Sequence, residues 1–198
     1  IRGVVTGADP ELDLDGARRL GAAFVELLDL SGGTLVMGHD MRQLGEELSV
    51  AFADGARRAG ASIIDLGLTS TDLLWFGSGQ LDLPGVQFTA SHNPARYNGM
   101  KFCLAGASPV RPGFTAELRE RAATVTMGEK VMGDYEERDL TAEFVAHLDR
   151  LVPMTGQRRL KVVVDAGNGM AGLTVPRVLA NREVDLIGLY MEPDGTFP

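Results

Sequence analysis

The sequence is poor in cysteine and lacks any long apolar run. Of its 198 residues only Cys103 is a cysteine, which excludes an internal disulfide and is typical of a reducing compartment. No run of about 18 apolar residues is present, so we expect no membrane-spanning helix. The pattern of a secretory signal peptide is also missing. We therefore predict a cytoplasmic protein with no membrane partner.

Basic residues are also in the minority. The chain has 19 Lys and Arg against 27 Asp and Glu, a net charge of −8. Binding to nucleic-acid phosphates needs clustered basic side chains, so this balance argues against a nucleic-acid partner. An anionic small ligand is not excluded, because a local cluster of donors can override the net charge.

What the sequence does contain is a regular alternation of helical patterns and short apolar runs. We expect helices at 13–30, 44–59, 71–77, 112–125, 140–151 and 170–180. We expect strands at 34–40, 61–67, 85–90, 100–105, 159–166 and 183–190, and a turn-rich segment at 128–134. The strands at 85–90 and 100–105 are joined by one loop and are expected to pair. The alternation predicts an α/β fold, a three-layer α/β/α domain with a mixed sheet.

A second unit begins where this alternation is interrupted, at 152–159. We assign residues 1–140 to the first domain and 141–198 to a second domain of similar type. The second domain has only two expected strands and one helix, too little to cover a sheet on both faces. The chain has no initiator Met and stops on turn residues, so we expect a piece of a longer protein.

The stretch FTASHNPARYNGMKF (88–102) places many hydrogen-bonding groups on one loop. Ser91 follows an apolar strand, the usual position of ligand-handling residues in α/β folds. His92 is adjacent, and Lys101 lies beyond a turn. A serine, a base and a cation suit nucleophilic or phosphoryl chemistry. A polar loop that merely joins two strands is the alternative interpretation.

A serine hydrolase is disfavoured for the same loop. Neighbouring Ser and His side chains usually point apart, whereas a catalytic His must reach the Ser hydroxyl. In addition, Thr89 and Asn93 stand where a G-x-S-x-G elbow has glycines.

This loop resembles the phosphoserine loop of the α-D-phosphohexomutases, the family of phosphomannomutases and phosphoglucomutases. Four other stretches resemble segments of the same family: IRGVV (1–5), GHDMR (38–42), VVVDAGNGMAG (162–172) and EPDGTFP (192–198). The resemblance implies an isomerase of carbohydrate metabolism that interconverts hexose 6-phosphate and hexose 1-phosphate, with mannose or glucose as the sugar. Ser91 would carry a phosphate, pass it to the sugar to form a hexose 1,6-bisphosphate, and take back the other phosphate. Tyr97 before Asn98-Gly99 resembles the phosphomannomutase branch, and phosphoglucosamine mutase is the nearest alternative.

The resemblance also assigns roles to individual residues. The implied catalytic residues are Ser91, His92, Lys101 and Arg2, and the implied substrate-binding residues are Asn93, Asn98 and Arg42. Asn93 and Asn98 have a second interpretation, that they shape the loop. The G-x-D-x-R motif with Asp40 and Arg42 likewise has a second interpretation, that it braces the catalytic loop. Mg²⁺ is the implied cofactor, held in part by the phosphate on Ser91, because Mg²⁺ prefers oxygen ligands.

Parts of the family pattern are missing from this sequence. The D-G-D-x-D-R metal loop, the sugar-recognition loop and the terminal phosphate-binding domain are not found. The chain thus resembles the first domain and the start of the second, and we expect these 198 residues alone to be inactive. Asp13 and Asp15 stand at a helix start and are interpreted as capping residues, not metal ligands.

One motif supports a rival hypothesis. GNGMAG (167–172) is a G-x-G-x-x-G between a strand and a helix, with Glu192 further on, which is typical of a dinucleotide-binding module. In such a module the tight turn follows the apolar strand directly, whereas here Asp165 and Ala166 separate the strand from Gly167. This difference weakens the dinucleotide-binding hypothesis. A non-catalytic sugar-phosphate-binding module is a third hypothesis.

Overall fold

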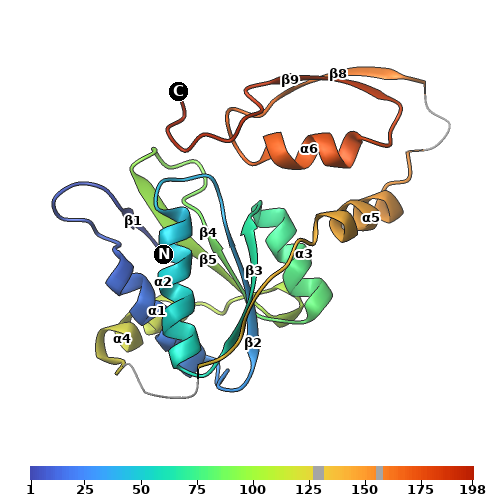
Figure 1. The fold of residues 1–198 in the computed structure, drawn as a ribbon. Helices are drawn as coiled ribbons and strands as arrows, with labels where there is room; N and C mark the ends of the chain where they lie inside the picture. Colours follow the sequence, from blue (N-terminus) through green and yellow to red (C-terminus); the bar gives the residue numbers. More distant parts are fainter. Residues whose placement is uncertain (127–131, 155–157) are drawn as a thin grey trace.

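The computed structural model describes residues 1–126, 132–154 and 158–198. Within these residues seven strands form one sheet in the order β1-β5-β4-β2-β3-β7, with β6 beside β5 (Figure 1). The strands are β1 (Arg2–Val4), β2 (Thr34–His39), β3 (Ser62–Leu68), β4 (Gly85–Phe88), β5 (Tyr97–Leu104), β6 (Ser108–Pro109) and β7 (Tyr135–Glu137). The helices are α1 (Leu14–Leu27), α2 (Gly45–Arg58), α3 (Thr71–Leu81), α4 (Phe114–Thr124), α5 (Thr141–Leu151) and α6 (Ala171–Leu179), with a 3-10 turn η1 (Ala105–Ala107).

The sheet is mixed, as predicted. Strands β2, β3 and β4 are parallel, because the helices α2 and α3 carry the chain back between them. Strand β5 runs antiparallel to β4, with Gln87 opposite Lys101 and Phe88 opposite Met100. This confirms the predicted pairing and places the Ser91 loop at the end of β4, at one edge of the parallel strands.

Helices cover both faces of this sheet, which confirms the three-layer prediction. Helices α1, α2 and α4 lie on one face and α3 on the other (Figure 1). The first face holds the larger core, where aromatic rings from α1, α2, α4, β4 and β5 meet at centroid distances of 5.5–6.2 Å: Phe24, Phe52, Phe88, Phe102 and Phe114. Burial of these large side chains is the main stabilising contribution to the domain.

Helices α1 and α2 pack unusually closely. Asp13 caps α1 by accepting a hydrogen bond from the N–H of Gly16 at 2.7 Å, as its position predicts. A Cβ at Gly21 would lie 2.0 Å from the carbonyl oxygen of Phe52, and a Cβ at Gly55 would lie 1.8 Å from that of Arg18. The two glycines therefore set the distance between the helices.

The second unit consists of β8 (Leu160–Asp165), α6 and β9 (Val184–Leu189), with the two strands parallel. Helix α5, which the sequence assigned to this unit, packs on α3 of the first domain through Leu73, Leu140 and Phe144. Arg177 of α6 donates to the hydroxyl of Thr141 at 3.2 Å. Helix α5 thus lies between the two units and contacts both.

Several predicted boundaries were wrong. Helix α3 continues to Leu81 and ends at Asp82, whose backbone is left-handed (φ 54°). Strand β5 begins at Tyr97, three residues before the predicted start, so Asn98 and Gly99 belong to the sheet. The short strands β1, β6 and β7 were not predicted, since two or three residues carry no periodicity. Of the turn-rich segment predicted at 128–134, residues 128–131 lie outside the described part.

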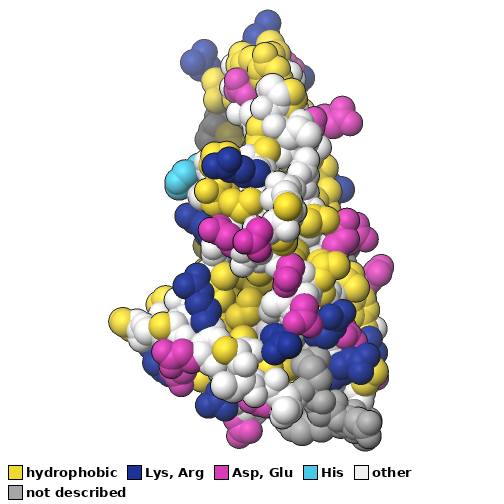
Figure 2. Space-filling view, turned by 90° about the vertical axis from the view of Figure 1, so that its left-hand side faces the viewer, with side chains coloured by type: hydrophobic (Ala, Val, Ile, Leu, Met, Phe, Trp, Pro, Cys, Tyr) yellow, Lys and Arg dark blue, Asp and Glu magenta, His cyan; other side chains and the backbone are white. Residues whose placement is uncertain are grey.

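The surface carries charges of both signs. On the side that lies at the left in Figure 1, acidic and basic side chains are interspersed (Figure 2). No helix among the described residues is long and apolar enough to cross a membrane.

Candidate functional site

The centre of the site is the loop 89–96, which joins β4 to β5 and presents Ser91. Ser91 and His92 are both exposed, and the backbone of Ser91 is left-handed (φ 57°), a conformation that costs a non-glycine residue energy. The loop holds this shape through hydrogen bonds from Ser91 N to Thr89 Oγ1 at 2.9 Å and from Asn93 N to Ala90 O at 3.1 Å. An exposed hydroxyl on a residue whose backbone is held in one shape is a favourable arrangement for a nucleophile.

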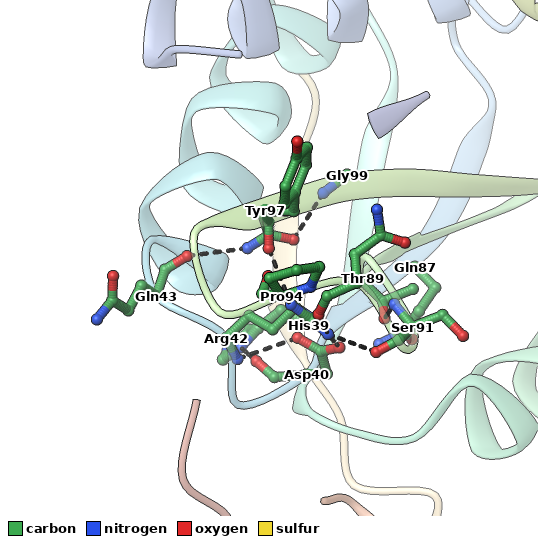
Figure 3. A network of polar contacts seen from close by, with 12 residues as sticks. His39, Asp40, Arg42, Gln43, Gln87, Thr89, Ser91, Pro94, Tyr97 and Gly99 are labelled. Atoms are coloured by element: carbon green, nitrogen blue, oxygen red, sulfur yellow. Dashed lines mark hydrogen bonds and ion pairs between the residues drawn. The ribbon is translucent and has the colours of Figure 1, made fainter. Parts of the chain in front are cut away.

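Arg42 supports this loop from below. Its side chain is fully buried, and its guanidinium donates to three carbonyl oxygens of the loop and to that of Tyr97, where β5 begins (Figure 3). The acceptors are Pro94 at 3.1 Å, Tyr97 at 3.0 Å, Asn93 at 2.7 Å and Ser91. A planar fork of donors can satisfy several carbonyls at once, which a lysine cannot do.

Asp40 holds Arg42 in turn. The backbone N–H of Arg42 donates to Asp40 Oδ1 at 3.0 Å, and Arg42 Nε lies 3.6 Å from Asp40 Oδ2, an ion pair too long for a hydrogen bond. Burial raises the pKa of Asp40 above its ordinary value, while the Thr89 hydroxyl, the Arg42 N–H and the guanidinium charge oppose that rise. Burial likewise lowers the pKa of Arg42, and Asp40 opposes the effect.

Asn98 fixes the far end of the loop. Its side chain is buried in β5, where Nδ2 donates to the carbonyl of Gln43 at 3.0 Å and Oδ1 accepts from the N–H of Gly99 at 2.8 Å. These contacts favour the interpretation that Asn98 and Arg42 support the loop, and their contact with a substrate stays a prediction. Both side chains are committed to backbone groups and lack the exposed polar atoms that a sugar would contact.

Two cations of the predicted site lie on β1 and β5. Arg2 pairs with Gly99, and a Cβ at Gly99 would lie 2.9 Å from Arg2 Cγ, so the arginine side chain crosses the space that the glycine leaves free. Lys101 stands two residues further along β5, so its side chain projects from the same sheet face as that of Arg2. Residue Thr89, two before Ser91, is joined to Gly99 by a backbone hydrogen bond of 2.9 Å.

The structure thus brings the predicted residues into one region. Ser91, His92 and Asn93 lie on the loop, Arg2 and Lys101 come from adjacent strands, and the carboxylate within the support network is the buried Asp40. Of the two cations, Arg2 stands opposite Gly99, close to the end of the loop, and Lys101 is two residues further along β5.

A metal ion is less well provided for. Among the residues that the structure describes, no group of three or more His, Cys, Asp or Glu side chains is arranged to hold a metal. Ser91 itself offers one hydroxyl oxygen. The described residues by themselves do not fit a Mg²⁺ site, so no step below is derived through a metal ion.

Sequence reasoning missed Thr89 as part of the site. Its hydroxyl accepts from Ser91 N and also opposes the rise in the pKa of Asp40, so Thr89 lies between Ser91 and the buried ion pair. Threonine hydroxyls often bond the backbone N–H two residues further on in turns, so a threonine two residues before Ser91 was the signal that the sequence offered.

The chain has clear relatives among known proteins. The family description "Phosphoglucomutase/phosphomannomutase, alpha/beta/alpha domain I" matches residues 1–129. A protein named "Phosphohexose mutases" from Xanthomonas campestris is 38% identical over 192 residues, covering 95% of this chain and 42% of that protein. A "Phosphomannomutase" of Salmonella typhimurium is 35% identical over 199 residues, with 95% and 43% covered.

A solved structure agrees with these sequence matches. A phosphoglucomutase/phosphomannomutase family protein from Burkholderia thailandensis superposes with a TM-score of 0.87 at 33% identity, covering 100% of this chain and 44% of that one. The chain spans less than half the length of these relatives. Its first domain, its loop motif and its relatives agree, and the chain belongs to the phosphoglucomutase/phosphomannomutase family.

Proposed function

We propose that Ser91 carries the phosphoryl group in an enzyme that interconverts hexose 6-phosphate and hexose 1-phosphate. The observation that supports this proposal best is the exposed Ser91 hydroxyl on a loop that has strained backbone and is fixed by Arg42. Arg2 and Lys101 lie on the strands β1 and β5 beside this loop. Phosphoryl transfer needs positioning and charge neutralisation more than covalent help from the protein, and the loop offers both.

The proposed reaction has two transfers. In the first, a sugar hydroxyl attacks the phosphorus on Ser91, the bond from phosphorus to Ser91 Oγ breaks, and a hexose 1,6-bisphosphate forms. The sugar then turns, and Ser91 Oγ attacks the phosphorus of its other phosphate. The bond from that phosphorus to the sugar oxygen breaks, the sugar oxygen takes up a proton, and the phosphoserine and a hexose monophosphate result. The proton of the attacking hydroxyl must be removed in each step, and His92 or Lys101 is the group we propose for this transfer.

The charged side chains have a separate part in this proposal. Arg2 and Lys101 neutralise the phosphoryl oxygens as negative charge accumulates on them. Asn93 holds the turn after Ser91, and its carbonyl is fixed by Arg42. Mg²⁺ stays a prediction, for which the phosphate on Ser91 would supply oxygen ligands.

The test is a peptide-resolved mass spectrum of the full-length protein from its native source, before and after incubation with glucose or mannose 1,6-bisphosphate. We expect one phosphoryl group on Ser91. The Ser91→Ala variant should lose both this modification and hexose phosphate turnover, while its thermal melt stays unchanged because Ser91 is exposed.

Two results would count against the proposal. If the Ser91→Ala variant keeps mutase turnover, Ser91 is not the phosphoryl carrier. If Ser91 stays bare in the parent protein while a hexose phosphate still binds, the loop is a sugar-phosphate-binding site without the reaction. Comparing mannose, glucose and glucosamine phosphates as substrates would identify the sugar.

A further inference from the structure

Residues 194–197, called the tail below, lie against Arg42 and its neighbours, which support the Ser91 loop. The guanidinium carbon of Arg42 is 4.9 Å from the centroid of the Phe197 ring. Gly195 passes so close to residues 41–43 that a Cβ there would lie 2.4 Å from the carbonyl oxygen of Met41. In Figure 1 the C-terminus accordingly returns to the edge of the sheet where the loop lies.

Phe197 covers one side of Arg42, although Phe197 itself is 36% exposed. The edge of the guanidinium faces the loop carbonyls and Asp40, and these contacts leave its flat faces free to stack. An aromatic ring over a desolvated guanidinium is attractive because the negative face of the ring meets the positive charge. The ring also keeps water from competing for the donors that hold the loop.

The tail is itself held in shape by the second unit. Asn168, in the G-N-G turn, forms three hydrogen bonds of 2.9 Å with the segment 190–194. Its N–H and its Nδ2 donate to the carbonyl oxygens of Tyr190 and Glu192, and its own carbonyl accepts from the N–H of Asp194. Asp194 Oδ1 accepts from the N–H and the hydroxyl of Thr196 at 2.8 Å. These bonds fix the turn that delivers Phe197 to Arg42.

A second contact holds the unit to the first domain. Helix α6 packs against α5, and a cavity of about 20 Å³ remains between Leu73 of α3, Phe144 of α5 and Leu173 of α6. The placement of the second unit is therefore tied to the first domain both at this seam and at Arg42.

We propose that the tail Asp194–Phe197 positions the Ser91 loop by closing over Arg42. The G-N-G turn, which resembled a dinucleotide fingerprint, then serves to orient this tail. Movement of the second unit would withdraw Phe197, expose Arg42 to water and loosen the loop that carries the nucleophile. The link between the tail and the Ser91 loop through Arg42 rests on these contacts. Only its consequence for phosphoryl transfer rests on the proposed function.

The test is hydrogen–deuterium exchange of peptides covering residues 91–98, measured by mass spectrometry on the full chain. Phe197→Leu should raise exchange of these amides about tenfold, because the cation–π contact is lost. Phe197→Tyr keeps the ring and should exchange as the parent does. Gly195→Ala should act like Phe197→Leu, since its new Cβ collides with the Met41 carbonyl.

The matched control is Tyr190→Leu. Tyr190 is also an aromatic residue with left-handed backbone in the second unit, but its side chain is 64% exposed. A peptide covering β2 reports general destabilisation. The proposal is overturned if Phe197→Leu leaves the loop at the parent rate, if Tyr190→Leu raises it equally, or if the β2 peptide rises in step.

The outcome separates this inference from the proposed function. If loop exchange is faster in Phe197→Leu but Ser91 is never phosphorylated in the parent protein, the link between tail and loop is supported and the proposed mutase function is refuted. Normal phosphorylation of Ser91 with no effect of Phe197→Leu on exchange keeps the mutase and removes the link. If both hold, Phe197→Leu should also slow phosphorylation of Ser91, and Phe197→Tyr should restore it.

Discussion

Replacing Arg42 by methionine tests whether the loop depends on one buried cation. The four carbonyl acceptors of Arg42 would lose a charged donor, and hydrogen bonds to charged groups contribute roughly 1.5–3 kcal/mol each. Most of that loss is recovered, because the loop is largely exposed and, once Arg42 no longer holds it, can turn these carbonyls towards water. Asp40 is different, since it is 7% exposed and would remain as an unpaired buried charge.

The unpaired carboxylate therefore sets the magnitude. Removing one partner of a buried ion pair costs about 3–5 kcal/mol, so we expect Arg42→Met to lower the free energy of unfolding by about 4 kcal/mol. With a urea m-value of about 2–3 kcal/mol/M, the midpoint should fall by roughly 1.3–2 M. The control is Arg58→Met, whose exposed ion pair with Asp54 at 2.9 Å should contribute only about 0.3–0.5 kcal/mol.

The cost should also depend on pH. The pKa of Asp40 is already raised by burial in the parent, and Arg42 is one of the groups that limit the rise. In the Arg42→Met variant the pKa of Asp40 in the folded state rises further. At low pH the carboxyl is neutral and its burial costs little. As the pH increases through the folded-state pKa the buried carboxyl becomes charged, and the variant loses stability. The difference between variant and parent should thus shrink from pH 7 towards pH 4.

Two results of the urea titrations would refute this reasoning. One is a loss below about 1 kcal/mol at pH 7, comparable with that of the Arg58→Met control. The other is a loss that does not change between pH 7 and pH 4. Either would mean that Asp40 is hydrated or paired in some other way when Arg42 is absent.

Two further predictions concern the core. Gly55→Ala should lower the free energy of unfolding by about 3 kcal/mol in urea titrations, because its Cβ would lie 1.8 Å from the Arg18 carbonyl oxygen. Gly79→Ala in α3 is the control and should raise the free energy of unfolding by about 0.5–1 kcal/mol, because alanine favours the helix and the new Cβ would lie 3.8 Å from Ala107 Cβ. Equal effects of the two substitutions would contradict the packing argument. Cys103 is buried and its pKa is raised by that burial, so it should not react with a disulfide reagent at pH 8 until urea unfolds the chain. Fast reaction of the folded protein would contradict its burial.

Much of the first domain could be predicted from local patterns. Helical spacing of apolar residues and alternating apolar runs located most of the helices and the longer strands, because both signals repeat within one element. The loop motif located Ser91, His92, Asn93 and Lys101 within fifteen residues of sequence. The short strands β1 and β7 could not be predicted, since they form by pairing with β5 and β3 and have no periodicity of their own.

The role of Arg42 shows where local patterns stop. The G-x-D-x-R motif marks it in the sequence, but the choice between substrate contact and loop support depends on which groups surround it. Its acceptors lie 49–55 residues further on, and Phe197 lies at the end of the chain. No periodicity or propensity connects positions so far apart, because only the packed sheet brings them together.

The amino-acid sequence by itself determined the α/β class, the loop that presents Ser91 and the resemblance to the phosphohexomutases. These depend on short-range order, namely hydrophobic period, turn residues and a contiguous motif. Tertiary structure alone decided that Arg2 shares a sheet face with Lys101, that Arg42 and Asn98 turn inward to hold the loop, and that the tail covers Arg42. The physical reason is that strand register and burial assign each polar side chain its partner, and both are properties of the assembled fold.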